Sequence, residues 1–293
     1  MLNFFKNPNV NTKFIQSNSH NIIKVDTKYG NLYLLKHDEF ITNTFKRGNY
    51  WAENEIKIIE DLLNLKDINN LTYFDIGANI GSHILAISKI FKNRINIYCF
   101  EAQKFIFEIL KINIGENYLK NVHVFHNAVS DNNNQIKIKI PNYEELNNFG
   151  SLELITPRYS DNNKIKFSNL YEKVNSIKLD EFSEVKVDFI KIDIEGMEHL
   201  AIKGGAHLIK KQRPFLLIEL IKTDHFPILK IFGELNYKAY LINNENGLFI
   251  PNEYDLPIKN LKENFIILTL NEFGAGEGIR TLDFNLGKVA LYP

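Results

Sequence analysis

Apolar runs of strand length alternate with longer amphipathic runs through the middle of the chain, and this alternation restricts the fold more than any other feature of the sequence. Three runs rich in Ile, Val, Tyr and Phe occur at 71–76, 95–102 and 122–130, and helical patterns occupy 81–91 and 104–117. Strands and helices that alternate in this way form βαβ units, in which neighbouring strands run parallel and helices cover both faces of the sheet. The sequence therefore predicts an α/β fold with a mostly parallel sheet.

The second half of the chain continues the alternation. Strands are predicted at 185–194 and 214–220, with a helix between them and a further helix around 224–235. Two closing strands are expected at 237–242 and 264–270. Because the turn-rich loop between them shows no helical pattern, they are predicted to form an antiparallel hairpin at the edge of the sheet.

Residues 1–70 are predicted to form a hairpin and a helix that pack on the main domain. Short β-like runs flank a KYGN turn within 21–35, and apolar residues share one helical face within 51–65. The main domain is predicted to span 71–272. It includes an inserted antiparallel segment at 132–180, where Asn-rich turns and short alternating runs replace the helical pattern.

The last residues differ in composition from the rest of the chain. Up to about residue 271 the residues Asn, Lys and Ile dominate, whereas 273–293 are rich in Gly with Ala and Arg. The first set has AT-rich codons and the second has GC-rich codons, as when a reading frame runs on into a stable-RNA gene. The sequence therefore predicts that 273–293 form a tail outside the fold.

Charge and cysteine content limit the expected partners. Lys+Arg and Asp+Glu number 35 each, and the chain has no basic run of the kind found in nucleic-acid-binding proteins. It shows neither the apolar core of a signal peptide nor an apolar stretch of membrane-helix length. Cys99 is the only cysteine and lies in an apolar run typical of a core. We expect a cytoplasmic protein with a small-molecule partner, no nucleic acid and no membrane span.

Polar side chains end several of the predicted strands. In an open α/β sheet, ligands bind beyond the carboxyl ends of the strands, and these ends carry Asp75, Glu101, Asn127, Asp193 and Glu219. After the first of them the chain reads G-A-N-I-G before a helix begins. The glycines permit a sharp turn and let backbone N–H groups approach a ligand at the helix N-terminus. A nucleotide-like cofactor is the expected ligand.

The spacing of this glycine loop favours one kind of cofactor. A dinucleotide fingerprint needs a middle glycine that leaves room for pyrophosphate, and Asn79 occupies that position. Asp75 lies just before the loop, where its charge would repel a diphosphate and attract a cation. These residues favour S-adenosylmethionine, which carries an ammonium and a sulfonium, over NAD. Glu101 suits the ribose of either, so a nicotinamide-dependent oxidoreductase stays an alternative, as does a binding module without catalysis.

Four stretches of the chain point to a known family. They read FDIGANIGSHILAIS, FEAQKFIFEILKINI, VFHNAVSD and VDFIKIDIEGMEHLAIKGGAHLIKKQRPFLLIEL. The first is common to class I methyltransferases, and the last resembles a signature specific to the FkbM-type S-adenosylmethionine-dependent methyltransferases. The resemblance covers roughly 50–270. It implies a Rossmann-like class I methyltransferase fold, with a seven-stranded sheet and an antiparallel last strand, and methyl transfer to a hydroxyl of a carbohydrate or secondary metabolite.

The resemblance also implies which residues hold the cofactor. The glycine loop would surround its methionine part, the second strand end would bind its ribose, and the third would lie against its adenine. The cofactor-binding set implied in this way is Asp75, Gly77, Ala78, Asn79, Gly81, Glu101, Asn127 and Ala128. The segment 148–154, NFGSLEL, matches one that the family carries between its third and fourth strands, which supports an acceptor pocket there.

Catalysis requires alignment of the acceptor and removal of a hydroxyl proton. Asp193 ends the strand that faces the methyl group in this fold and Glu195 follows it, so we predict these two as catalytic residues, with Asp193 as general base or acceptor anchor. Glu198 is explained by the helix dipole alone. A metal-assisted mechanism would add Glu219, but nothing in the sequence fixes it and no metal site is predicted. His83 is interpreted as a surface or packing residue.

Overall fold

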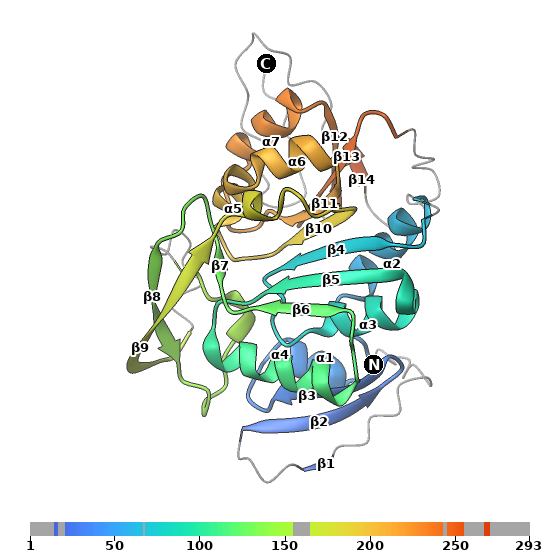
Figure 1. The fold of residues 1–293 in the computed structure, drawn as a ribbon. Helices are drawn as coiled ribbons and strands as arrows, with labels where there is room; N and C mark the ends of the chain where they lie inside the picture. Colours follow the sequence, from blue (N-terminus) through green and yellow to red (C-terminus); the bar gives the residue numbers. More distant parts are fainter. Residues whose placement is uncertain are drawn as a thin grey trace.

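The structure is a computed structural model, and it describes residues 15–16, 21–66, 68–154, 165–242, 245–254 and 267–269. A twisted central sheet carries helices on both faces, and the N-terminal strands lie beyond one layer of helices (Figure 1). The tail predicted at 273–293 falls outside the described residues. None of the described helices combines the length and hydropathy needed to cross a membrane.

The described part of the main sheet has eight strands, in the order β14-β12-β13-β11-β10-β4-β5-β6. Their bounds are β4 Leu71–Ile76, β5 Ile95–Phe100, β6 Val122–Phe125, β10 Phe189–Ile192, β11 Phe215–Glu219, β12 Tyr237–Ile242, β13 Asn246–Pro251 and β14 Ile267–Thr269. The five strands from β11 to β6 pair in parallel, and β13 is antiparallel to both β11 and β12. The strands from β6 to β12 confirm the predicted mostly parallel sheet with an antiparallel last strand, and β14 adds an antiparallel edge.

The closing part of the sheet differs from the prediction in one element. The segment interpreted as a turn-rich loop contains β13, which inserts between β11 and β12. The two predicted closing strands do pair antiparallel, as β12 with β14. β13 was missed because its six residues begin with Asn-Gly and end with Pro, which are turn signals, although Leu248, Phe249 and Ile250 between them are buried.

Side chains along each strand divide the core between the two faces of the sheet, because successive residues point to opposite sides. Tyr73 of β4 belongs to the cluster formed with α2, α3 and α4, and Phe74 to the cluster formed with α5, α6 and α7. All six residues of β4 are buried, as expected for a strand covered on both faces. The helices are α1 Ile41–Lys46, α2 Glu53–Asn64, α3 Ser82–Phe91, α4 Lys104–Glu116, α5 Glu198–Gly204, α6 Ala206–Gln212 and α7 His225–Glu234.

The predicted N-terminal hairpin is present and packs on α4. β1 (Ile15–Gln16), β2 (Ile22–Thr27) and β3 (Gly30–Leu35) form a three-stranded antiparallel sheet. The side chain of Asn113 accepts the N–H of Tyr33 at 2.6 Å and donates to the carbonyl oxygens of Tyr33 and Ile80, at 3.0 and 2.7 Å. One side chain of α4 therefore ties the hairpin to the glycine loop. The domain boundary at residue 70 stays a prediction.

The predicted insertion contains an antiparallel pair, β8 (Gln135–Pro141) with β9 (Phe167–Ile177). β7 (Ala128–Val129) pairs in parallel with β9 and completes a second small sheet. The single strand predicted at 122–130 is therefore wrong in its second half, since the chain leaves the main sheet after β6 and joins the insertion (Figure 1). The described 3₁₀ helices are η1 Lys92–Arg94, η2 Phe149–Ser151 and η4 Leu179–Phe182.

Candidate active site

A cavity of about 370 Å³ opens at the carboxyl ends of the parallel strands. It lies at the end of β4, which has β5 on one side and β10 on the other. After β4 the chain enters α3 on one face of the sheet, and after β10 it enters α5 on the opposite face. Ligands of α/β sheets bind at such a point. Asp75 and Gly81 lie behind the cavity wall, and the other predicted site residues line it: Gly77, Ala78, Asn79, Glu101, Asn127, Ala128, Asp193 and Glu195.

The glycines of the loop are required by close contacts with neighbouring elements. Gly77 has a φ of +83°, and a Cβ there would lie 1.8 Å from the carbonyl oxygen of Asp193. Gly81 has a φ of +90°, and its Cβ would lie 2.7 Å from Leu110 of α4. The sequence assigned these glycines to a sharp turn and to the approach of a ligand. The structure shows that they also let the loop pack between β10 and α4.

Backbone N–H groups of the loop are bonded within the protein. Those of Gly77 and the next residue donate to the carbonyl oxygen of Phe100, at 3.0 and 2.9 Å, and that of Asn79 donates to the carboxylate of Glu101 at 2.9 Å. Asn79 has a φ of +49°, in the left-handed region that Asn tolerates better than most residues. The backbone conformation therefore gives a second reason for Asn at this position, besides the type of cofactor.

Asp75 is sealed behind the cavity, with 1% of its surface exposed. Its side chain shares one face of β4 with Tyr73, and its register partner on β10 is Lys191. Neither carboxylate oxygen meets hydrogen-bond geometry with a partner among the described residues. Burial raises the pKa of Asp75, and the positive charge of Lys191 opposes the rise. Because the side chain does not reach the cavity wall, a direct contact with the cofactor stays a prediction.

Glu101 lines the cavity and is 6% exposed. Its two oxygens accept the N–H groups of Asn79 and Gln103, at 2.9 and 2.8 Å. Burial raises the pKa of Glu101 to about 7, although these two bonds favour the ionised form. Each oxygen keeps a second lone pair that can accept a ligand hydroxyl. Asn127, at the end of the next strand, is oriented by a bond from its Nδ2 to the carbonyl oxygen of Asn175 at 3.1 Å.

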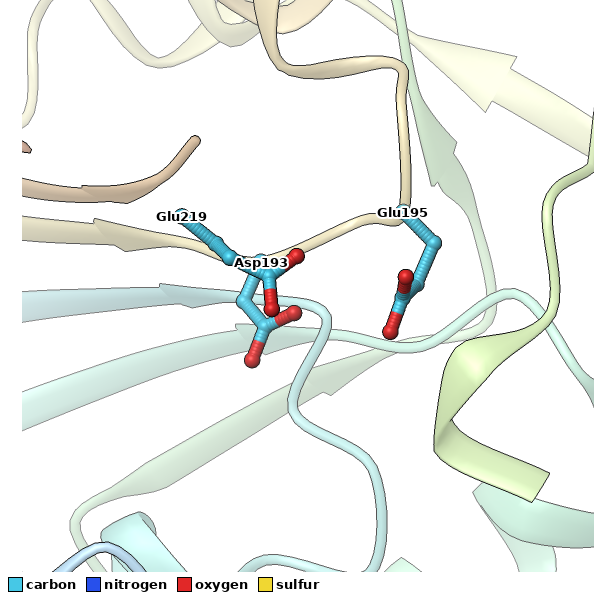
Figure 2. A group of neighbouring side chains, drawn as sticks. All are labelled: Asp193, Glu195 and Glu219. Carbon is cyan, nitrogen blue, oxygen red and sulfur yellow. The ribbon is translucent and has the colours of Figure 1, made fainter. Parts of the chain in front are cut away.

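Three acids, here called the acid cluster, meet at the ends of β10 and β11 (Figure 2). They are Asp193, Glu195 and Glu219, and one oxygen of each lies within 4.8 Å of the others. The Nζ of Lys191 lies 2.9 Å from Asp193, and the Nζ of Lys222 lies 2.8 Å from Glu195. The Oε2 atom of Glu219 is buried without a hydrogen-bond partner among the described residues. Two of the three carboxylates are therefore paired with lysines.

Crowding changes the proton affinity of the acid cluster. Burial, followed by repulsion from Asp193, raises the pKa of Glu195 to about 8, and Lys222 opposes the rise. The same two causes raise the pKa of Glu219 well above its usual range. Both glutamates therefore bind a proton more tightly than an exposed carboxylate does. Asp193 is more open to solvent than Glu195, with 37% against 13% of the side chain exposed.

Glu198 holds the turn that follows β10. It is 1% exposed, and its carboxylate accepts the N–H groups of Ile194 and Gly196, each at 3.0 Å. Glu195, between them, has a φ of +54°, which is strained for a residue with a side chain. The sequence explained Glu198 by the helix dipole alone, whereas the structure shows that it fixes the backbone from which Glu195 projects.

The segment 148–154 contributes to the cavity wall and is held there by two buried side chains. The Nε2 of Gln103 donates to the carbonyl oxygen of Phe149 at 3.2 Å, and the Nζ of Lys222 donates to the carbonyl oxygen of Ser151 at 2.9 Å. Lys222 therefore joins this segment to the acid cluster.

The chain was also compared with known proteins. Residues 75–239, more than half of the chain, match the family described as Methyltransferase FkbM domain. The chain belongs to the FkbM methyltransferase family. This membership confirms the prediction of a methyltransferase, and S-adenosylmethionine, the methyl donor of the family, is its cofactor. The oxidoreductase alternative is set aside by the same match.

The chain is also similar to solved structures of methyltransferases. An FkbM methyltransferase from Methylobacillus flagellatus is 15% identical with a TM-score of 0.44, and the match covers 62% of this chain and 44% of that one. A precorrin-6y C5,15-methyltransferase from Geobacter metallireducens is 13% identical (TM-score 0.35), with 67% and 86% covered. A putative caffeoyl-CoA O-methyltransferase from Staphylococcus aureus is 12% identical (TM-score 0.38), with 67% and 82% covered. The chain thus spans less than half of the Methylobacillus protein. No curated protein matches it.

Two lysines of this FkbM methyltransferase were not among the residues predicted from the sequence. Lys191 lies within FIKI, a strand whose four residues are all buried. Because a buried lysine needs an acidic partner, its position two residues before Asp193 was a usable signal. Lys222 follows β11 in a loop, and nothing in its sequence context points to Glu195 or to Ser151.

Chelation is expected to leave methyl transfer unchanged. The acid cluster offers oxygen ligands of the type that Mg²⁺ prefers, but the ammonium groups of Lys191 and Lys222 already contact two of its three side chains. A dication would have to displace both ammonium groups. Initial rates of labelled-methyl transfer with and without EDTA test this expectation. A loss that Mg²⁺ restores and KCl does not would assign the acid cluster to a metal instead.

Proposed function

We propose that this FkbM methyltransferase moves a methyl group from S-adenosylmethionine to a hydroxyl of a small acceptor, a carbohydrate or a secondary metabolite. The observation that carries the proposal is that the cofactor-type residues and the acid cluster line one cavity. A hydroxyl has a high pKa, so methyl transfer to its oxygen is faster when a carboxylate takes the hydroxyl proton. Cofactor and base would then act on the same bound acceptor.

The donor set of the cavity fits this cofactor. Glu101 presents carboxylate oxygens suited to the two ribose hydroxyls. Asn127 and Ala128 present a polar and an apolar contact suited to the adenine edge and face. When bound, S-adenosylmethionine supplies an electrophilic methyl group on a positively charged sulfur, and acidic side chains at the other end of the cavity suit that charge.

We assign different roles to the two predicted catalytic acids. Asp193 is the more exposed and would take the hydroxyl proton at a carboxylate oxygen while the acceptor oxygen gains the methyl group. Glu195, whose pKa is raised to about 8 by burial and by repulsion from Asp193, would donate a hydrogen bond and orient the acceptor. Glu198 and Lys222 hold Glu195 in place.

The cavity mouth suits a neutral acceptor with an apolar face. Phe40 and Ile221 line the cavity with about half of their surface exposed, at 51% and 50%, and Trp51 lines it as well. Such side chains pack on the C–H face of a sugar or on an apolar ring. The acid cluster in the same cavity disfavours a phosphorylated or carboxylated acceptor. The predicted cytoplasmic location and the absence of a nucleic-acid partner stay predictions.

Two measurements test the proposed function. We expect calorimetry to show one S-adenosylmethionine site, and Glu101→Ala to weaken binding by about 1–3 kcal/mol through loss of hydrogen bonds to a charged group. Exposed Asp26→Asn on β2 serves as the control and should bind normally. Labelled-methyl transfer into a fractionated cell extract, with the product identified by mass, should place the label on an oxygen. Folded protein that binds no cofactor would refute the proposal, and label on nitrogen or carbon would refute the hydroxyl acceptor.

A further inference from the structure

The carboxylate of S-adenosylmethionine needs a positively charged partner in a cavity that is otherwise acidic. This inference rests on the proposed function, because it concerns how the same cofactor is held. The cofactor carries an ammonium, a sulfonium and one carboxylate. Acidic residues lining the cavity would repel that carboxylate; they are Glu55, Glu101, Asp193, Glu195, Glu219 and Glu245.

Only two basic side chains line the cavity within the described part of the chain, those of His83 and Lys191. Lys191 is already committed to the acids, since its Nζ lies 2.9 Å from Asp193 and its register partner is Asp75. Its side chain is 4% exposed. His83 is paired with one acid, Glu55, and its charge also acts on Asp75, so its second ring nitrogen is the donor on which the inference rests.

His83 is held in one orientation by Glu55 of α2. The residue is 6% exposed, and its Nε2 lies 3.0 Å from a carboxylate oxygen of Glu55. Burial opposes ionisation of Glu55, but the hydrogen bond and charge of His83, together with the charge of Lys191 and a hydrogen bond from Asn246, lower its pKa. The Nδ1 atom of His83 makes no hydrogen bond within the described residues. An imidazolium has two N–H donors, so it can serve Glu55 on one side and a ligand carboxylate on the other.

The place of His83 in the fold also suits an anion. It is the second residue of α3, a helix of ten residues whose N-terminus no side chain caps. The start of this helix is fixed by Tyr50, whose hydroxyl donates to the carbonyl oxygen of Ser82 at 2.8 Å. Ser82 lines the same cavity. The partial positive charge of a helix N-terminus adds to the attraction of the imidazole for a carboxylate.

We infer that His83, oriented by Glu55, binds the carboxylate of the methionine part of S-adenosylmethionine through its Nδ1. The sequence interpretation had assigned His83 to surface or packing. Glu55 precedes the segment that matches the family, 75–239, so a residue of the N-terminal unit acts as a positioning residue for the cofactor site.

The test compares two ligands that differ only in this carboxylate, S-adenosylmethionine and decarboxylated S-adenosylmethionine, by calorimetry without acceptor. Wild type should prefer the first. His83→Gln should lower the affinity for S-adenosylmethionine about tenfold or more, the effect of losing one charged hydrogen bond, and leave the decarboxylated ligand within about twofold. His207→Gln, on the exposed face of α6, is the matched control and should change neither affinity.

A second variant keeps the test decisive. Glu55→Gln retains the shape of the residue but removes its charge, and it should weaken binding of S-adenosylmethionine alone, by less than His83→Gln does. If circular dichroism shows that His83→Gln does not fold, the affinities of Glu55→Gln for the two ligands decide whether the inference holds. Equal losses for both ligands, or no loss for S-adenosylmethionine, would overturn the inference and leave the proposed function standing. Wild-type protein that is folded and binds neither ligand would overturn both.

Discussion

Gly77→Ala is expected to destabilise the protein by more than about 4 kcal/mol, a loss that approaches the whole stability of many domains. The added Cβ would lie 1.8 Å from the carbonyl oxygen of Asp193 and 2.9 Å from its carbonyl carbon. Both atoms belong to the backbone at the end of β10, which is buried between β4 and β11. No side-chain rotation relieves this contact, so the glycine loop or the strand end must move. Urea unfolding followed by circular dichroism measures the loss.

Two other glycines separate the causes of this effect. Gly48 has a φ of +82° with nothing within 4 Å of its Cβ position, so Gly48→Ala should cost only the left-handed backbone term of about 1–2 kcal/mol. Gly115 lies in α4 with open space around it, and Gly115→Ala should stabilise by about 0.5–1 kcal/mol. If Gly77→Ala costs no more than Gly48→Ala, the contact with Asp193 is not the reason for glycine in the loop.

The location of the site was predictable because it follows from topology. The carboxyl ends of parallel strands meet at one edge of a sheet, so Glu101, Asn127 and Asp193 had to lie near one another once the strands were recognised. Their order along the sheet follows from the βαβ crossovers, which are right-handed with few exceptions. The structure places all three on the wall of one cavity.

The orientation of individual side chains was less accessible from the sequence. Ile76 lines the cavity and Asp75 does not, whereas on β10 the register partner of Asp75, Lys191, does. Both faces of the sheet therefore contribute to the cavity wall, and the loop after β4 packs Gly77 against the carbonyl oxygen of Asp193. This contact joins residues more than a hundred positions apart, so no local pattern records it.

Contacts between segments distant in sequence account for the remaining differences. Lys222 meets Ser151 and Glu195, and Glu55 meets His83. Each contact joins a loop or a helix end to a distant segment, and the local sequence on either side contains no motif that indicates the contact. The N-terminal unit was predicted as a hairpin and a helix, but its contribution to the cavity wall depends on packing that only the folded chain shows.

Asp193→Asn is expected to lower the rate of methyl transfer about 10²–10⁴-fold, the usual contribution of a general base. The amide has the same shape, and its oxygen can still accept the hydrogen bond of Lys191, which lies 2.9 Å away in the parent protein. The fold and the cofactor site should therefore survive, and the affinity for S-adenosylmethionine should stay within about threefold, less than the loss of one hydrogen bond to a charged group. Initial rates with the identified acceptor, and calorimetry for the cofactor, measure the two effects separately.

The pH dependence of the variant separates a base from an anchor. Without a base, only acceptor molecules whose hydroxyl is already deprotonated can react. The residual rate of Asp193→Asn should therefore rise about tenfold per pH unit, whereas the rate of the parent protein should not show this slope above neutral pH. Asp26→Asn should behave as the parent does. If Asp193→Asn loses rate without any change in pH dependence, Asp193 anchors the acceptor rather than removing its proton. Unchanged turnover would remove it from the reaction, and the acid cluster would then act through Glu195 or Glu219.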